Sequence, residues 1–239
     1  TSGVTAWYRD AAGCASAIAN IMGQPMIPSA LEFLDAGALN LLRTHYTDMI
    51  PAKASALLMI EVDGTPSDIE QASAAILAAC RQAGLLEAQV VADTRSLWAA
   101  RKALSPLLRD IAPKKINEDI VVPVTRIPEL LSGIAELSGK HQVANVNFGH
   151  AGNGNIHVNL LVDPDKPDDL RRAEKCLDEV FDLVVRLNGT LSGEHGIGSE
   201  KRAFIGKEID KATLDLMRSI KRVFDPKGIL NPGKLFPED

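Results

Sequence analysis

The stretch NFGHAGNGNIHVNLLV (residues 147–162) places a glycine turn between two segments that are rich in apolar residues. Strands are expected over 143–149 and 156–162, and the connection between them is too short for a parallel crossover. Gly152 and Gly154 permit the positive φ angles that tight turns need. The stretch therefore predicts an antiparallel hairpin, and with it an antiparallel sheet.

Short strands and amphipathic helices are expected to alternate along the rest of the chain. Apolar runs predict further strands over 56–62, 88–93 and 118–124. Helical periodicity and stop signals predict helices over 8–22, 95–105, 127–140, 168–187 and 208–223. The pattern predicts an α+β fold, an antiparallel sheet with flanking helices and ferredoxin-like character.

Two serine–glutamate pairs have the spacing of a capping box. Ser29 precedes Glu32, and Ser67 precedes Glu70, with two residues between the partners in each pair. In a capping box, each of the two side chains bonds the backbone amide of the other residue at the start of a helix. We therefore expect one helix after Ser29 and another after Ser67, the second ending before Gly84.

Composition and charge narrow the class of protein. The chain has 239 residues, 46% of them hydrophobic, so it can bury a substantial core. Its net charge of −5, without a long basic run, argues against a nucleic-acid surface. No apolar run approaches the ~20 residues of a membrane span. Three scattered cysteines without a C-x-x-C pair predict reduced thiols and a cytoplasmic location.

Two of the five histidines, His150 and His157, bracket the glycine turn. In a strand over 156–162, His157 and Asn159 share one face. His150 ends the preceding strand, so both imidazoles can converge on one point. Two interpretations remain open, because this histidine spacing is not itself a strong metal signature. The pair either contributes to a metal site, or it belongs to a plain hairpin with one histidine bonded to a carbonyl.

A second glycine-rich loop, LSGEHGIG (191–198), sets Glu194 beside His195. Two imidazoles and one carboxylate would hold Zn²⁺ or Mn²⁺ and leave a position open for substrate. His195 could then act as a general base next to the cation. The alternative is a simple turn in which Glu194 pairs with Lys201 or Arg202.

A third group of candidates lies on and after the helix expected over 95–105. Arg101 and Ser105 are one helical turn apart and can face one pocket, where the arginine would bind a carboxylate. The alternative for Arg101 is a solvated helix face, and Lys115 has the same ambiguity. Trp98 is expected to pack in the core.

Three motifs together resemble a known family. NFGHAGNGNIHVNLL, LSGEHGIGSEKRAFI and FDPKGILNPGKLF, in this order, resemble the C-terminal half of FAD-linked 2-hydroxy-acid dehydrogenases and oxidases. That family includes glycolate oxidase flavoprotein subunits, D-lactate dehydrogenases and D-2-hydroxyglutarate dehydrogenases. MIPSALEFLD (26–35) and NEDIVVPVTRIPEL (117–130) are similar to it too.

The resemblance implies a metal centre and a base. His150, His157 and Glu194 match the metal ligands of the family. His195 matches the proposed catalytic base.

The resemblance also implies substrate and flavin contacts. Arg101 matches the carboxylate-binding arginine, and Ser105 falls where the family carries a hydroxyl residue. Lys115 is a looser match to a substrate-contacting lysine. Asn159 matches a residue near both substrate and flavin, and Asn231 is expected at the flavin.

The resemblance implies a division of the chain into a substrate-binding cap domain over 1–207 and a C-terminal helix and tail over 208–239. The tail would pack on an FAD-binding domain. No G-x-G-x-x-G fingerprint is present, and the chain starts at TSGVTAWYRD without methionine. We therefore expect a fragment or processed product that is inactive by itself.

The implied reaction is oxidation of a D-2-hydroxy acid to a 2-oxo acid. The implied cofactors are FAD, held mainly by the FAD-binding domain, and a divalent metal, Zn or Mn. The implied partners are the small 2-hydroxy acid, that FAD-binding domain and an electron-acceptor subunit. The implied location is the cytoplasm, with peripheral attachment to the inner membrane face as an alternative. Two other functions remain open, a metal-dependent hydrolase and a metal-binding structural or docking module. The absence of H-E-x-x-H argues against the hydrolase.

Overall fold

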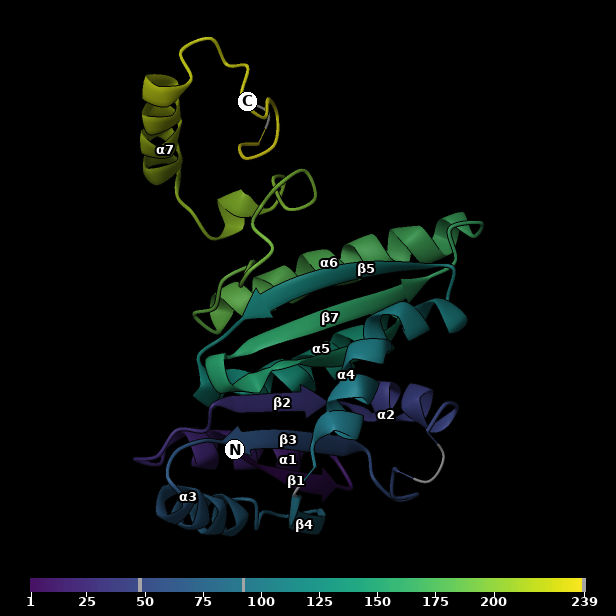
Figure 1. Cartoon of the computed structure of the whole chain (residues 1–239). Coiled ribbons are helices and arrows are strands. Elements are labelled where there is room, and N and C mark those ends of the chain that lie inside the picture. The colour runs from purple at the N-terminus through teal and green to yellow at the C-terminus, as the bar shows by residue number, and fades with distance from the viewer. Residues whose placement is uncertain (47–48, 92, 238–239) are drawn as a thin grey trace.

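The computed structural model describes residues 1–46, 49–91 and 93–237. Within them, seven strands form one antiparallel sheet in the order β4-β1-β3-β2-β6-β7-β5 (Figure 1). The strands are β1 (Ser2–Tyr8), β2 (Ala30–Leu34), β3 (Ala56–Val62), β4 (Leu85–Val91), β5 (Lys114–Val121), β6 (Ala144–His150) and β7 (Asn155–Val162). The helices are α1 (Ala11–Met22), α2 (Ala36–Arg43), α3 (Pro66–Ala79), α4 (Arg95–Leu107), α5 (Ile127–His141), α6 (Pro167–Arg186) and α7 (Lys211–Phe224).

The first half of the chain has a ferredoxin-like arrangement. Its order β1-α1-β2-β3-α3-β4 and its strand order β4-β1-β3-β2 are those of a split βαβ unit, with α2 inserted between β2 and β3. The second half extends the sheet where β6 pairs with β2. The predicted α+β fold, an antiparallel sheet with flanking helices, is confirmed.

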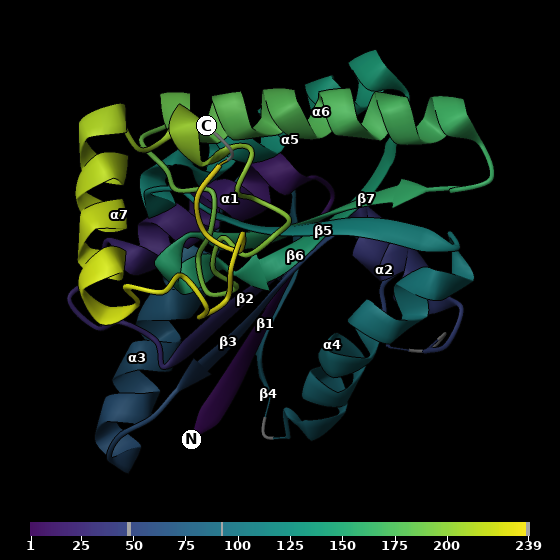
Figure 2. The same ribbon diagram turned by 90° about the horizontal axis from the view of Figure 1, so that it is seen from above.

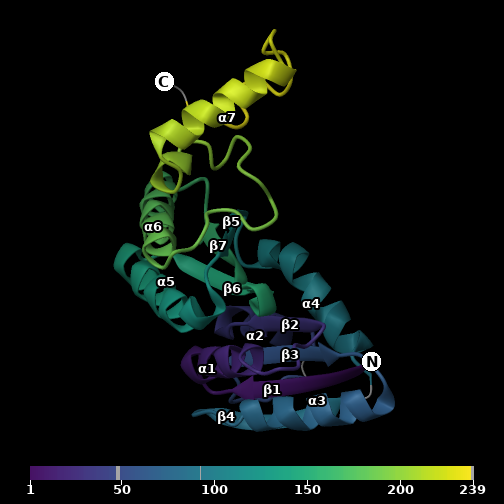
Figure 3. The same cartoon turned by 90° about the vertical axis from the view of Figure 1, so that its left-hand side faces the viewer.

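Helices cover both faces of the sheet (Figure 2). The larger core lies under α1, α3, α5 and α6 and includes Ile18, Phe33 and Phe181. The smaller core lies on the other face, under α2 and α4, and includes Leu39 and Leu104. Helix α7 stands apart from the sheet (Figure 3). Among the described residues, no helix combines the length and apolar character that a bilayer crossing requires.

The hairpin predicted over residues 147–162 is present. β6 pairs with β7 so that Phe148 lies opposite His157. Gly154 has a φ of +79°, whereas Gly152 does not use the positive φ that its lack of a side chain permits. Gly149 is needed for a different reason, because a Cβ there would lie 2.4 Å from the carbonyl oxygen of Asn155.

The first capping-box prediction is wrong. Ser29 and Glu32 do not open a helix, since residues Ala30–Leu34 form β2 between β3 and β6. The helix that follows is capped by Asp35, whose side chain accepts a hydrogen bond from the amide of Ala38. Pairing on both sides of β2 outweighs the local capping signal.

The second capping box lies two residues earlier than predicted. Thr65 and Asp68 form it, in place of Ser67 and Glu70, and α3 ends at Ala79. The helix predicted over 8–22 begins at Ala11, because the residues before it form β1. That strand was not predicted. Ala92, at the end of the strand predicted over 88–93, lies outside the described residues.

Candidate functional site

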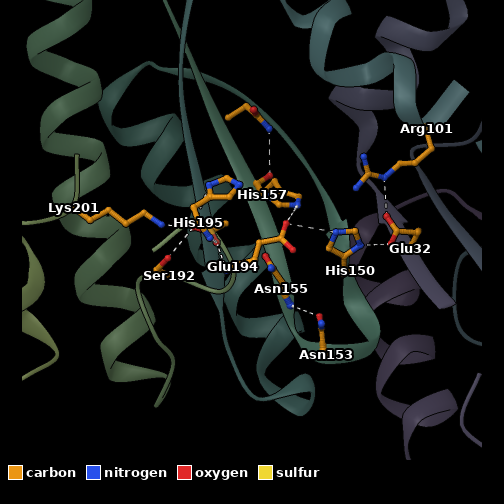
Figure 4. Close-up of polar contacts among 12 residues, drawn as sticks. Glu32, Arg101, His150, Asn153, Asn155, His157, Ser192, Glu194, His195 and Lys201 are labelled. Atoms are coloured by element: carbon orange, nitrogen blue, oxygen red, sulfur yellow. Dashed lines mark hydrogen bonds and ion pairs between the residues drawn. The ribbon is translucent and has the colours of Figure 1, made fainter. Parts of the chain in front are cut away.

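Three predicted metal ligands meet on the face of the sheet next to α4. Ligand atoms of His150, His157 and Glu194 all lie within 4.8 Å of one another. Oε1 of Glu194 lies 3.9 Å from Nε2 of His150 and 3.6 Å from Nε2 of His157. The three side chains point toward one another in Figure 4. The hairpin supplies the two imidazoles, and the loop after α6 supplies the carboxylate.

This donor set fits a divalent cation. Two imidazole nitrogens and one carboxylate oxygen are ligands that Zn²⁺ and Mn²⁺ accept. Burial, followed by the influence of His150 and Arg101, lowers the pKa of His157 to about 4, so its ring is neutral and able to ligate at physiological pH. Nδ1 of His150 contacts Glu32, which leaves Nε2 facing Glu194.

Glu32 is a site residue that sequence reasoning missed. Its side chain is 4% exposed, and one oxygen contacts Nδ1 of His150 while the other accepts a hydrogen bond of 2.8 Å from Nε of Arg101. The hydrogen bond to Glu32 raises the pKa of His150. The signal in the sequence was a single carboxylate inside the apolar segment ALEFL, which the capping-box interpretation assigned to a helix instead.

A cavity of about 350 Å³ adjoins the three ligand residues His150, His157 and Glu194, which are called the triad below. Arg101 and Ser105 line it together with His150, His157 and His195, so the structure brings most of the predicted substrate and metal residues to one place. The guanidinium carbon of Arg101 lies 4.5 Å from the centre of the Phe148 ring. This stacking and the ion pair with Glu32 hold the arginine in place.

The imidazole of His195 lies over that of His157. Its ring is 5.7 Å from that of His157, with an angle of 23° between the planes. Lys201, which one sequence interpretation paired with Glu194, instead contacts Asp119 and lies 3.3 Å from Glu118. That pairing is wrong, and Glu194 remains directed at the histidines.

Three other predicted site residues, Lys115, Asn159 and Asn231, are not among the described residues that line this cavity. Nζ of Lys115 donates a 2.7 Å hydrogen bond to Ser105 Oγ, and Lys115 lines a larger groove of about 1030 Å³ along β5 and α6. Asn159 is fully buried and donates to the carbonyl of Val146. Asn231 is exposed in the C-terminal loop. Their substrate and flavin roles stay predictions.

Comparison with known proteins gives a consistent set of relatives. A family model described as "FAD linked oxidases, C-terminal domain" matches residues 3–235. The glycolate oxidase subunit GlcD of Bacillus subtilis is 33% identical over 238 residues, which cover 98% of this chain and 50% of that protein. D-2-hydroxyglutarate dehydrogenase of Stutzerimonas stutzeri is 33% identical over 190 residues, which cover 74% of this chain and 40% of that protein. The chain spans about half the length of the curated relatives it matches.

A solved structure shares the fold. p-Cresol methylhydroxylase with bound substrate matches with a TM-score of 0.74 at 15% sequence identity. The match covers 98% of this chain and 52% of that one. At this identity the likeness extends to the fold alone.

Proposed function

The chain belongs to the family of C-terminal domains of FAD-linked oxidases, and on this premise we propose that the protein oxidises a D-2-hydroxy acid to the 2-oxo acid. The observation that carries the proposal is the convergence of Arg101, His195 and the two histidines of a metal-type triad at one cavity. Its relatives include a protein named as a glycolate oxidase subunit and others named as D-lactate and D-2-hydroxyglutarate dehydrogenases.

Arg101 binds the carboxylate that every 2-hydroxy acid carries. Its Nε is engaged by Glu32, so the terminal nitrogens are available for two parallel hydrogen bonds to the substrate. Ser105 lines the same cavity and offers a hydroxyl group. Because the guanidinium also stacks on Phe148, the substrate meets an arginine that is already oriented.

His150, His157 and Glu194 would hold the divalent metal, and His195 takes the proton of the substrate hydroxyl. When bound, FAD accepts the hydride equivalent that leaves C2, and the cation lowers the pKa of a neighbouring hydroxyl. Loss of the O–H proton to His195 and of the C2 hydrogen as hydride leaves the carbonyl of the 2-oxo acid. Zn and Mn both suit the donor set.

We assign the FAD-binding segment to the part of the protein that corresponds to the other half of the relatives' length. In this proposal residues 1–207 form the cap over the flavin, and residues 208–239 dock on the FAD-binding segment. Exposed apolar side chains of α7 support the docking: Leu216, Ile220, Val223 and Phe224. The relative named as a subunit supports a partner subunit that accepts electrons.

Two alternative functions, a metal-dependent hydrolase and a metal-binding structural module, explain fewer of the residues at the site. A metal-dependent hydrolase would use the triad and His195, but it gives no role to the oriented arginine or to the family membership. A structural module would need no base beside the histidines. A metal-binding structural role is distinguished from catalysis by the effect of His195 substitution on turnover.

The decisive experiment is expression of the full-length protein that contains this chain. We expect a yellow flavoprotein that reduces a dye acceptor with at least one of glycolate, D-lactate, D-malate and D-2-hydroxyglutarate. Metal analysis should find Zn or Mn, and a His150→Ala/His157→Ala double variant should lose it. A flavin-loaded protein that is inert toward all four acids and toward their homologues would overturn the proposal.

A further inference from the structure

A buried carboxylate, Asp119 of β5, lies under the loop that carries Glu194 and His195. Its Oδ2 accepts hydrogen bonds from both of these backbone amides, at 2.5 Å and 2.7 Å. Its backbone carbonyl accepts a third, of 2.8 Å, from the amide of Gly193. One residue of the sheet thus holds three consecutive amides of the loop.

The other carboxylate oxygen of Asp119 has its own partners. Nζ of Lys201 contacts Oδ1, and the same ammonium group donates to the carbonyl of Leu191 at 2.8 Å. The side chains of Asp119 and Lys201 are 0% and 3% exposed. A buried ion pair is tolerated when further hydrogen bonds satisfy both groups, as they do here.

The imidazole of His195 faces the same oxygen. Its Nδ1 lies 3.4 Å from Oδ1 of Asp119, an ion-pair distance that a substrate complex can shorten. Figure 4 shows Lys201 and Ser192 reaching this region from one side while Glu194 points to the histidines on the other. With Nδ1 directed at a carboxylate, Nε2 is the nitrogen left for a proton from substrate.

We propose that Asp119 is the positioning residue of this site: it holds the Glu194–His195 segment in its ligating conformation and orients His195 with the proton on Nδ1. Lys201 compensates the buried charge of Asp119 and keeps the carboxylate in place. The inference rests on the proposed function, which supplies the ligand role of Glu194 and the base role of His195.

The test compares Asp119→Asn with Glu118→Gln in the full-length protein. Both carboxylates lie near Nζ of Lys201, but it is the carboxylate of Asp119 that accepts hydrogen bonds from the amides of Glu194 and His195. The asparagine side chain has one acceptor oxygen and one NH₂ donor. It therefore cannot accept from the amides of Glu194 and His195 and from the Lys201 ammonium group together. We expect Asp119→Asn to weaken Zn²⁺ binding roughly 10–100-fold and Glu118→Gln to change it less than about twofold.

A second readout needs neither metal nor turnover. Histidine-selective ¹⁵N labelling reports which ring nitrogen carries the proton, and a His195→Gln variant assigns the signal. In the neutral ring we expect the proton on Nδ1 in the wild type and in Glu118→Gln, and a shift toward Nε2 in Asp119→Asn. In turnover, Asp119→Asn should lower kcat more than it changes KM.

The outcomes separate this inference from the function on which it rests. If wild-type His195 carries its proton on Nε2, the positioning role is overturned, even where Asp119→Asn does not fold. Equal effects of Asp119→Asn and Glu118→Gln would also overturn it, because they would reduce Asp119 to a partner of Lys201. If the wild type binds no Zn²⁺ or Mn²⁺, the metal part of the proposed function fails, while the tautomer measurement still decides the role of Asp119.

Discussion

Glu32 and Arg101 form an ion pair between strand β2 and helix α4, with Oε2 of the glutamate 2.8 Å from Nε of the arginine. The other oxygen of Glu32 contacts Nδ1 of His150. One buried carboxylate therefore orients both the residue proposed to bind substrate and a residue proposed to bind metal. A change at Glu32 should disturb both.

The first prediction concerns this shared carboxylate. Glu32→Gln removes the charge and leaves a single acceptor for two donors, so we expect Zn²⁺ affinity to fall roughly 10–100-fold, as for other partners of metal-bound histidines. Glu61→Gln is the matched control. Glu61 lies on β3, the strand next to β2, accepts hydrogen bonds from Trp98 and Thr94, and is not one of the triad residues. Equal affinities for Glu32→Gln and the control in a calorimetric titration would contradict the orienting role.

The second prediction concerns the base. His195→Asn in the full-length enzyme should lower kcat by about 10²–10⁴-fold with a modest change in KM, because a general base acts mainly in the transition state. His141→Asn serves as control, since His141 pairs with Glu179 outside the site. Near-normal kcat for His195→Asn in steady-state assays would remove this histidine from the base role.

The third prediction is a pH dependence of metal binding. A protonated imidazole cannot ligate, so binding weakens as pH falls through the pKa of each histidine ligand. Glu32 raises the pKa of His150, whereas burial lowers that of His157 to about 4. Below the raised pKa of His150, the free protein carries one proton on that ring, so Zn²⁺ affinity should fall by about tenfold per pH unit. His157 should take up a second proton only near pH 4.

Competition titrations with a chelating dye across pH 4–8 measure this dependence. Between pH 5 and the raised pKa of His150, the number of protons released on Zn²⁺ binding should approach one. Two released protons would show that both histidines are charged in the free protein, contrary to the burial of His157.

The fourth prediction concerns the hairpin. Gly149→Ala forces a Cβ to within 2.4 Å of the Asn155 carbonyl oxygen, so the strands must separate and the protein should lose about 1–3 kcal/mol of unfolding free energy. Gly139→Ala is the matched control, because a Cβ there meets nothing within 4 Å and the residue lies in α5. It should stabilise the protein by about 0.4–1 kcal/mol. Urea unfolding checks both signs, and a neutral Gly149→Ala would contradict the close strand pairing.

The fifth prediction concerns α7. Val223 is 77% exposed, so Val223→Asp should leave the fold of the cap intact yet prevent docking on the FAD-binding segment. We expect the flavin-to-protein absorbance ratio of the purified full-length protein to fall. Ile111→Asp, at a residue that is 48% exposed and lies outside α7, should leave this ratio unchanged. Equal flavin contents in the two variants would argue against docking through α7.

Features that depend on residues close together along the chain could be predicted from the amino-acid sequence. The turn between His150 and His157 follows from short-range glycine chemistry, and the apolar stripe of α6 follows from helical periodicity. The three predicted metal ligands could be named because two flank one turn and the third lies in a second glycine-rich loop. The order of the three motifs along the chain predicted the family, which the match to the family model confirms.

Features whose partners are distant along the chain could be identified only once the chain was folded. Glu32 has the local spacing of a helix cap, but pairing with β3 and β6 makes its segment a strand and buries its carboxylate against His150 and Arg101. Asp119 likewise lies inside a strand motif, and its loop partners come more than seventy residues later. A strand gains its hydrogen bonds, and a buried charge its partners, from segments that the fold brings together, so neither could be deduced from local pattern.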